Sequence, residues 1–210
     1  MIMEQLMREK LLTVKKEMEG FMKESVPFWL ENGIDKEYGG YLVCFDSKGK
    51  LMKELAVLTP EDKMIVTQTR MIWGFSALLR NGLAKRYGWE EKCKEAAKQG
   101  VDFFIDKFWD KKNTGWAWVT DRKGNVLDNG KLVYGQTFAI YALAEYYMAT
   151  GDERGIEYAE KTFDALKKYA ASKNKESKLT LIKRVREICL SFSSFNLYAL
   201  SIIGKNCVTS

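Results

Sequence analysis

An internal repeat constrains the fold of this chain more than any other feature. Residues 35–50 (DKEYGGYLVCFDSKGK) and residues 110–125 (DKKNTGWAWVTDRKGN) share Asp-Lys, a glycine turn, an aromatic and apolar run, and Asp-x-Lys-Gly, at a constant offset that aligns Asp110 with Asp35. Each segment predicts a turn followed by a small β-hairpin that closes at Lys48-Gly49 or Lys123-Gly124. The repeat therefore predicts a unit in which a helix ends, a hairpin follows and two helices come next.

The rest of the sequence predicts helices. Apolar spacing indicates them over residues 4–31, 61–81, 89–107, 132–149, 153–170 and 179–200. Helix pairs bury their faces by stacking on neighbouring pairs, and hairpins after every second helix emerge on one side, where they frame a central pocket if the array closes into a ring. Because two units and a fragment are too few to close, we expect an all-α fold with small β-hairpins that forms an incomplete α/α toroid.

Composition excludes several kinds of site. The chain has no histidine, and its four cysteines form no CxxC pair, so we expect no metal and no cofactor. Residues 1–160 hold 24 Lys+Arg against 25 Asp+Glu, a net charge of −1, whereas residues 161–210 hold 10 against 3, a net charge of +7. The aromatic clusters lie in the neutral part, which argues against nucleic acid. No stretch resembles a signal peptide or a membrane span, so we expect a cytoplasmic protein.

The sequence changes character after about residue 170. Only Gly204 of the 16 glycines lies beyond residue 160, no tryptophan follows Trp118, and the third hairpin due near residue 185 has no glycine. We therefore expect residues 1–170 to form one half of a domain and residues 171–210 to form an atypical basic tail. Two explanations stay open: a solvated end helix, or a frameshift or premature stop.

Two largely apolar helices carry the candidate ligand-binding residues. Residues 59–80 are apolar on nearly every side, so this helix should be an inner one, where the guanidinium of Arg70 needs an acceptor. Arg70 either forms a structural salt bridge or reaches solvent, or it holds sugar oxygens or a developing oxyanion. Tyr134 begins the second such helix on the side of the hairpins, where its hydroxyl can bind a ligand, whereas Tyr141, Tyr146 and Tyr147 are expected in the core.

The repeated hairpins offer two further kinds of chemistry. Their aromatic residues either stack on a sugar or pack across the strands, and these residues are Tyr38, Tyr41, Trp116 and Trp118. Their aspartates could supply a carboxylate pair for glycoside hydrolysis, but near-identical positions in the two repeats favour turn capping, and these residues are Asp35, Asp46, Asp110 and Asp121.

Three motifs in order resemble the N-acylglucosamine/cellobiose 2-epimerase superfamily. They are D-x-x-Y-G-G-Y at residues 35–41 after Trp29, Q-x-R-x-x-W-x-F-S at residues 68–76, and Y-G-Q-x-F-A-I-Y-A-L-A-E-Y-Y-x-A-T-G-D at residues 134–152. The resemblance covers about residues 5–170 and implies the first half of an (α/α)6 barrel with its active site in the central cavity. It also implies isomerase chemistry, in which the C2 proton of a reducing sugar is removed and returned on the opposite face.

The resemblance assigns roles to residues as well. It implies an arginine and a tyrosine from the first half that bind substrate, which match Arg70 and Tyr134, and two catalytic histidines from the later half. Since this chain has no histidine, we expect no catalytic residue in it and no 2-epimerase activity as written.

Three functional hypotheses follow. The first is a truncated, inactive sugar 2-epimerase whose ligand is a reducing mono- or disaccharide. The second is a non-catalytic carbohydrate-binding or assembly protein made from a half toroid, and the third is a hydrolase or lyase with a carboxylate pair. An unfinished ring would expose the apolar flanks of its end helices, which favours self-association. Which sugar is bound stays open.

Overall fold

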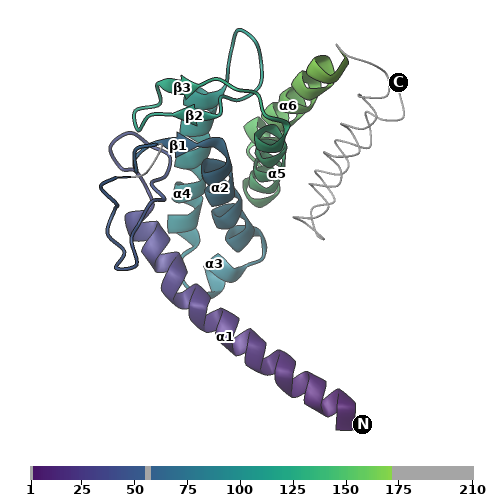
Figure 1. Cartoon of the computed structure of the whole chain (residues 1–210). Helices are drawn as coiled ribbons and strands as arrows, with labels where there is room; N and C mark the ends of the chain where they lie inside the picture. The colour runs from purple at the N-terminus through teal and green to yellow at the C-terminus, as the bar shows by residue number, and fades with distance from the viewer. Residues whose placement is uncertain (1, 55–57, 172–210) are drawn as a thin grey trace.

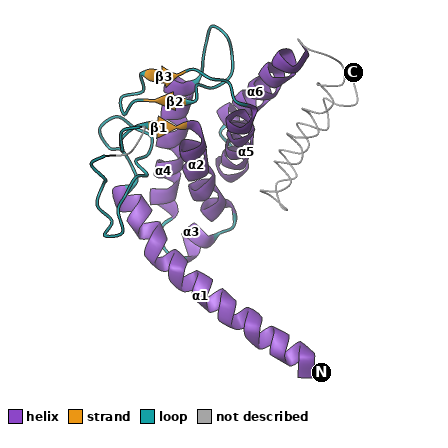
Figure 2. Ribbon diagram, viewed as in Figure 1, coloured by secondary structure: helices purple, strands orange, loops and turns teal. Residues whose placement is uncertain are grey.

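A computed structural model of the chain describes residues 2–54 and 58–171. The helices in this part are α1 (Ile2–Asn32), α2 (Ile65–Arg80), α3 (Leu83–Arg86), α4 (Glu90–Phe103), α5 (Val133–Thr150) and α6 (Glu153–Ala171), and one turn of π-helix, η1 (Phe104–Phe108), follows α4 (Figure 1). The strands β1 (Lys63–Met64), β2 (Val119–Thr120) and β3 (Val126–Asp128) form a small antiparallel sheet in that order (Figure 2). The predicted mainly α fold with small β elements is confirmed.

The helix predictions differ from the structure mostly at their ends. Helix α2 begins at Ile65 rather than near residue 61, because Lys63 and Met64 pair with Thr120 and Val119 of β2. The short helix α3 was not predicted. The predicted helix over residues 179–200 lies outside the described residues, and so does the basic tail beyond Ala171. The domain boundary near residue 170 therefore stays a prediction.

Helices α2 and α5 form the centre of the fold. They pack against each other, while α4 packs on α2 and α6 packs on α5 (Figure 1). Every residue from 135 to 146 of α5 is buried, which is expected of a helix that is apolar on all sides. No helix within residues 2–54 and 58–171 combines the length and the apolar character needed to cross a bilayer.

Hydrogen bonds in the two hairpin segments confirm the internal repeat. In the first turn of each segment, the aspartate N–H donates to a glycine carbonyl, from Asp35 to Gly40 at 3.0 Å and from Asp110 to Gly115 at 2.9 Å. The closing turn repeats in the same way: the Asp46 and Asp121 amides each donate to the carbonyl four residues on, both at 2.8 Å. The bridge from Ile34 to Tyr41 likewise recurs, at the same offset, as the bridge from Trp109 to Trp116.

A glutamine of each inner helix holds one hairpin segment in place. The Gln68 side chain in α2 accepts from the Tyr41 N–H at 2.9 Å and donates to the Tyr41 carbonyl at 2.8 Å. Gln136 in α5 does the same for Trp116, at 2.8 and 2.9 Å. Both glutamines are buried and lie in the first two turns of their helices. The hairpin segments are therefore fixed at the N-terminal ends of α2 and α5, on the same side of the fold.

Candidate functional site

Arg70 and Tyr134 both contact the same side chain, Phe138. Arg70 lies in the second turn of α2 and Tyr134 in the first turn of α5. The guanidinium carbon of Arg70 is 5.1 Å from the ring centroid of Phe138. The ring of Tyr134 meets the same ring edge-on, with centroids 4.9 Å apart and an interplanar angle of 72°. Sequence reasoning proposed the two residues separately and did not find Phe138, the buried residue that joins them.

Both candidate ligand-binding side chains, Arg70 and Tyr134, are accessible to solvent. Tyr134 is 43% exposed, Arg70 is exposed, and Phe138 beneath them is only 3% exposed. Of the settings that the sequence left open for Arg70, the structure shows the exposed one, because Ile65, Ile72 and Phe75 occupy the covered side of α2 and leave Arg70 on the open side. Within the part of the chain that the structure describes, no carboxylate pairs with Arg70, so its N–H donors remain available to a ligand.

One turn further along, a second contact joins the same two helices. The rings of Trp73 in α2 and Tyr141 in α5 are stacked, with centroids 5.4 Å apart and an interplanar angle of 22°. Tyr141 is buried, as predicted, and so is Tyr146, whose hydroxyl donates to Asp152 Oδ2 at 2.9 Å. These contacts fix the relative rotation of α2 and α5, and therefore the distance between Arg70 and Tyr134.

Two of the four hairpin aromatics, Tyr41 and Trp116, do not form the sugar platform that was left open as one alternative. Tyr41 and Trp116 are fully buried, and each donates a hydrogen bond inside the core: Tyr41 Oη to the Ala96 carbonyl at 2.8 Å and Trp116 Nε1 to Thr162 Oγ1 at 2.7 Å. These two side chains pack in the core, Tyr41 beside α4 and Trp116 beside α6. The remaining two, Tyr38 and Trp118, are half-buried.

The hairpin aspartates cap turns. Oδ1 of Asp46 accepts from two backbone N–H groups at 2.9 Å, and Oδ1 of Asp110 accepts from two at 3.0 and 2.9 Å. A backbone hydrogen bond from Asn113 is the main cause that holds the pKa of Asp110 well below its ordinary value. A carboxyl of low pKa does not act as a general acid near neutral pH. The predicted turn capping is confirmed, and no carboxylate pair for hydrolysis emerges from these residues.

Sequence reasoning missed a buried ionic cluster between the hairpin segments. Lys63 Nζ, which is inaccessible to solvent, donates to Asp35 Oδ2 at 2.9 Å, to the Gly39 carbonyl at 2.5 Å and to the Arg122 carbonyl at 2.8 Å. Arg122 Nε also donates to Asp35 Oδ2 at 3.0 Å. Burial favours the neutral form of Asp35, but hydrogen bonds from Arg122 and Lys63 outweigh it and lower the pKa of Asp35 to about 2. The cluster ties both hairpin segments to the start of α2.

Comparisons with known proteins agree with this architecture. The family model described as N-acylglucosamine 2-epimerase (GlcNAc 2-epimerase) matches residues 29–186. A cellobiose 2-epimerase of Bacteroides fragilis is 30% identical over 158 residues, which are 75% of this chain and 37% of that protein. A cellobiose 2-epimerase of Dictyoglomus turgidum is 36% identical over 136 residues, 64% of this chain and 31% of that protein.

A solved structure shows the same arrangement of helices. The cellobiose 2-epimerase from Bacillus thermoamylovorans B4167 matches with a TM-score of 0.64 and 28% identity, over 79% of this chain and 39% of that one. Paired helices with hairpins at the N-terminal ends of the inner helices define part of an (α/α)6 barrel. The chain belongs to the N-acylglucosamine 2-epimerase family. It spans about a third of the length of the curated relatives it matches.

Proposed function

We propose that this chain carries the substrate-holding part of a sugar 2-epimerase site, in which Arg70 and Tyr134 bind a reducing sugar. The observation that carries the proposal is their convergence on Phe138 at the open side of α2 and α5. A guanidinium offers several N–H donors in a fixed plane, and a phenol adds one donor and acceptor. Together they suit the vicinal hydroxyl and carbonyl oxygens of an opened sugar.

Arg70 can contribute to catalysis without transferring a proton. Removing the C2 proton places negative charge on the neighbouring oxygen, and a cation that already points at that oxygen stabilises the charge without reorganisation. The Tyr134 hydroxyl can hold a second oxygen so that the C2–H bond faces a base. Both residues therefore bind and orient the sugar in this proposal, and neither is assigned as the base.

The same proposal makes the 210-residue chain inactive by itself. Inversion at C2 requires one group on each face of the carbon that takes or gives a proton near neutral pH. The chain contains no histidine, and the pKa values of Asp35 and Asp110 lie far below neutrality. The family resemblance implies that two histidines from the later half supply these groups in full-length relatives.

An activity assay tests the proposed inactivity of the chain. Purified chain is incubated in D₂O with cellobiose, N-acetylglucosamine or glucose, and each sugar is analysed for its 2-epimer and for deuterium at C2. We expect neither product, because the sequence contains no histidine that could serve as the acid or the base. Appearance of the 2-epimer would sink the proposed inactivity, and a full-length relative such as the Dictyoglomus turgidum enzyme serves as the positive control.

A second candidate is a non-catalytic carbohydrate-binding or assembly protein. The absence of histidine from the sequence favours it as well, because binding needs only Arg70 and Tyr134. The two candidates differ in what complementation does. If a separately produced later half of a relative restores epimerisation when mixed with this chain, the isomerase lineage is supported, whereas binding without any restored turnover favours the second candidate.

A further inference from the structure

Trp118 lies where the second hairpin segment meets the starts of α2 and α5. Its carbonyl accepts from the Ile65 N–H at 3.0 Å, and its own N–H donates to the Asp128 carbonyl at 2.8 Å. The six-membered ring of the indole rests on Gly135, because a Cβ added at Gly135 would come within 2.8 Å of Trp118 Cζ3. Since Gly135 directly follows Tyr134, the indole lies at the same helix turn as a proposed sugar ligand.

The polar group of this indole is free to bind a ligand. Trp118 is half-buried, and among the residues that the structure describes nothing accepts a hydrogen bond from its Nε1–H. Nε1 is also not one of the enclosed polar atoms that lack a partner, so it reaches solvent. Trp116 differs, because its Nε1 donates to Thr162 Oγ1 at 2.7 Å. An indole that is apolar on its faces and carries one unpaired donor suits a sugar.

The internal repeat separates this indole from the residues that hold the hairpins. The clamping glutamines and the buried hairpin aromatics recur in both units. At the offsets of these recurring residues, the counterparts of Trp118, Tyr134 and Gly135 in the first unit are Val43, Val66 and Thr67. The indole, the tyrosine beside it and the glycine beneath it are therefore special to the second unit, and the repeated hairpin forms without them.

We propose that Trp118 is a third sugar-binding residue of the site that Arg70 and Tyr134 form. The inference rests on the proposed function. Its Nε1–H donates to a sugar hydroxyl, and its ring covers a face of C–H groups on the sugar. Arg70 lies five residues after Ile65, about 7–8 Å further along the axis of α2. Trp118 therefore contacts the part of the ligand nearer the hairpins, while Arg70 holds the part that lies deeper.

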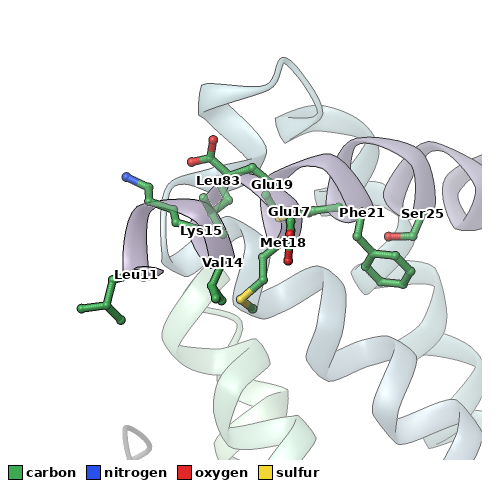
Figure 3. Close-up of a pocket in the computed structure, with 10 residues that line it drawn as sticks. Leu11, Val14, Lys15, Glu17, Met18, Glu19, Phe21, Ser25 and Leu83 are labelled. Carbon is green, nitrogen blue, oxygen red and sulfur yellow. The ribbon is translucent and has the colours of Figure 1, made fainter. Parts of the chain in front are cut away.

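The open groove beside α1 does not compete for the sugar. It has a volume of about 800 Å³. Leu11, Val14 and Phe21 project from one side of α1, whereas Lys15 and Glu19 point to the other (Figure 3). A sugar site needs polar groups that converge on the ligand, and the charged side chains of this groove point away from its apolar side.

Nuclear magnetic resonance of the indole N–H groups tests the proposal on the full chain. The six tryptophans give six indole signals in a ¹⁵N–¹H spectrum, and replacement of each by phenylalanine identifies its signal. We expect titration with cellobiose to shift the Trp118 signal and to leave the signal of the buried Trp116 in place. Trp118→Phe should weaken cellobiose binding about threefold to tenfold, as the loss of one hydrogen bond does. Trp89→Phe, which changes another half-buried tryptophan, should bind as the unaltered chain does.

Two results would overturn this proposal alone. A Trp118 signal that stays in place during a titration in which Arg70→Met abolishes binding would show that the sugar does not reach the indole. Equal affinities of Trp118→Phe, Trp89→Phe and the unaltered chain would show the same. Absence of cellobiose binding by the unaltered chain would overturn the proposed function as well. The signals of the unaltered protein decide the matter even if Trp118→Phe folds poorly, which circular dichroism reports.

Discussion

The guanidinium of Arg70 lies over the ring of Phe138, 5.1 Å from its centroid. This contact joins α2 to α5 at the open side of the fold, and Tyr134 approaches the same ring from its own helix. A single buried side chain thus sets the positions of both proposed sugar ligands.

A double-mutant cycle measures that contact. We expect Arg70→Met and Phe138→Leu to be coupled by about 0.5–1 kcal/mol in the free energy of unfolding, the usual range of an exposed cation–π contact. Urea unfolding of the two single variants and the double variant gives the coupling. Arg70→Met with Phe163→Leu, a buried ring of α6, is the matched control and should be additive. Additivity of the first pair would contradict the contact.

The paired side-chain hydrogen bonds of Gln68 and Gln136 should contribute strongly to the free energy of unfolding. Gln68→Leu removes both hydrogen-bond partners of the buried Tyr41 backbone, and each polar group left unsatisfied costs about 1–3 kcal/mol. We expect a loss of roughly 2–4 kcal/mol for Gln68→Leu and for Gln136→Leu, measured by urea unfolding. Gln5→Ala, at an exposed position of α1, should change stability by less than about 0.5 kcal/mol. Equally small losses of stability at Gln68, Gln136 and Gln5 would contradict this role of the two buried glutamines.

The ionic cluster predicts a specific pH dependence. The folded pKa of Asp35 is about 2, below its ordinary value of 3.8, so its contribution to stability is present above pH 3.8 and is lost as the pH falls toward 2. Asp35→Asn leaves Lys63 buried without its counter-ion and should cost about 3–5 kcal/mol at pH 6. The difference between the two proteins should shrink between pH 4 and pH 2 in urea unfolding. A difference that stays constant over this range would contradict the account.

Two helical glycines should respond in opposite directions to the same substitution. A Cβ at Gly74 in α2 meets no atom within 4 Å, so Gly74→Ala should stabilise the protein by about 0.5–1 kcal/mol because alanine favours helix. A Cβ at Gly100 in α4 would collide with the Tyr41 hydroxyl, so Gly100→Ala should destabilise it. Thermal unfolding compares the two variants. A Gly100→Ala variant as stable as Gly74→Ala would show that Tyr41 is placed differently.

Much of the fold could be predicted because its signals are local. The constant offset between the two hairpin segments predicted the paired turns, and the capping roles of Asp46 and Asp110 follow from short-range hydrogen bonds within each turn. Apolar periodicity predicted the five long helices to within a few residues, except where Lys63 and Met64 are recruited into β1. That pairing depends on β2, which lies far along the sequence, and no local pattern indicates it.

The candidate site was less predictable, because its contacts also join residues that lie far apart in the sequence. The resemblance indicated Arg70 and Tyr134, but the supporting ring of Phe138 depends on how α2 and α5 are rotated against each other. Sequence reasoning also left the setting of Arg70 open between a buried ion pair and an exposed position, because α2 is apolar on nearly every side. The only local sign of the ionic cluster was Lys63 directly before an apolar run, and its partners Asp35 and Arg122 come from two different hairpin segments.

Saturation-transfer NMR with cellobiose tests the central claim most directly, namely that Arg70 and Tyr134 bind a reducing sugar. Tyr134→Phe keeps the ring contact with Phe138 and removes only the hydroxyl, whereas Arg70→Met removes the cation. Arg86→Met, a change of another exposed arginine, controls for charge. The account predicts saturation of the reducing-end protons by the unaltered chain and by Arg86→Met, and a marked loss in both site variants. Equal saturation in all four proteins, or none with the unaltered chain, would contradict it.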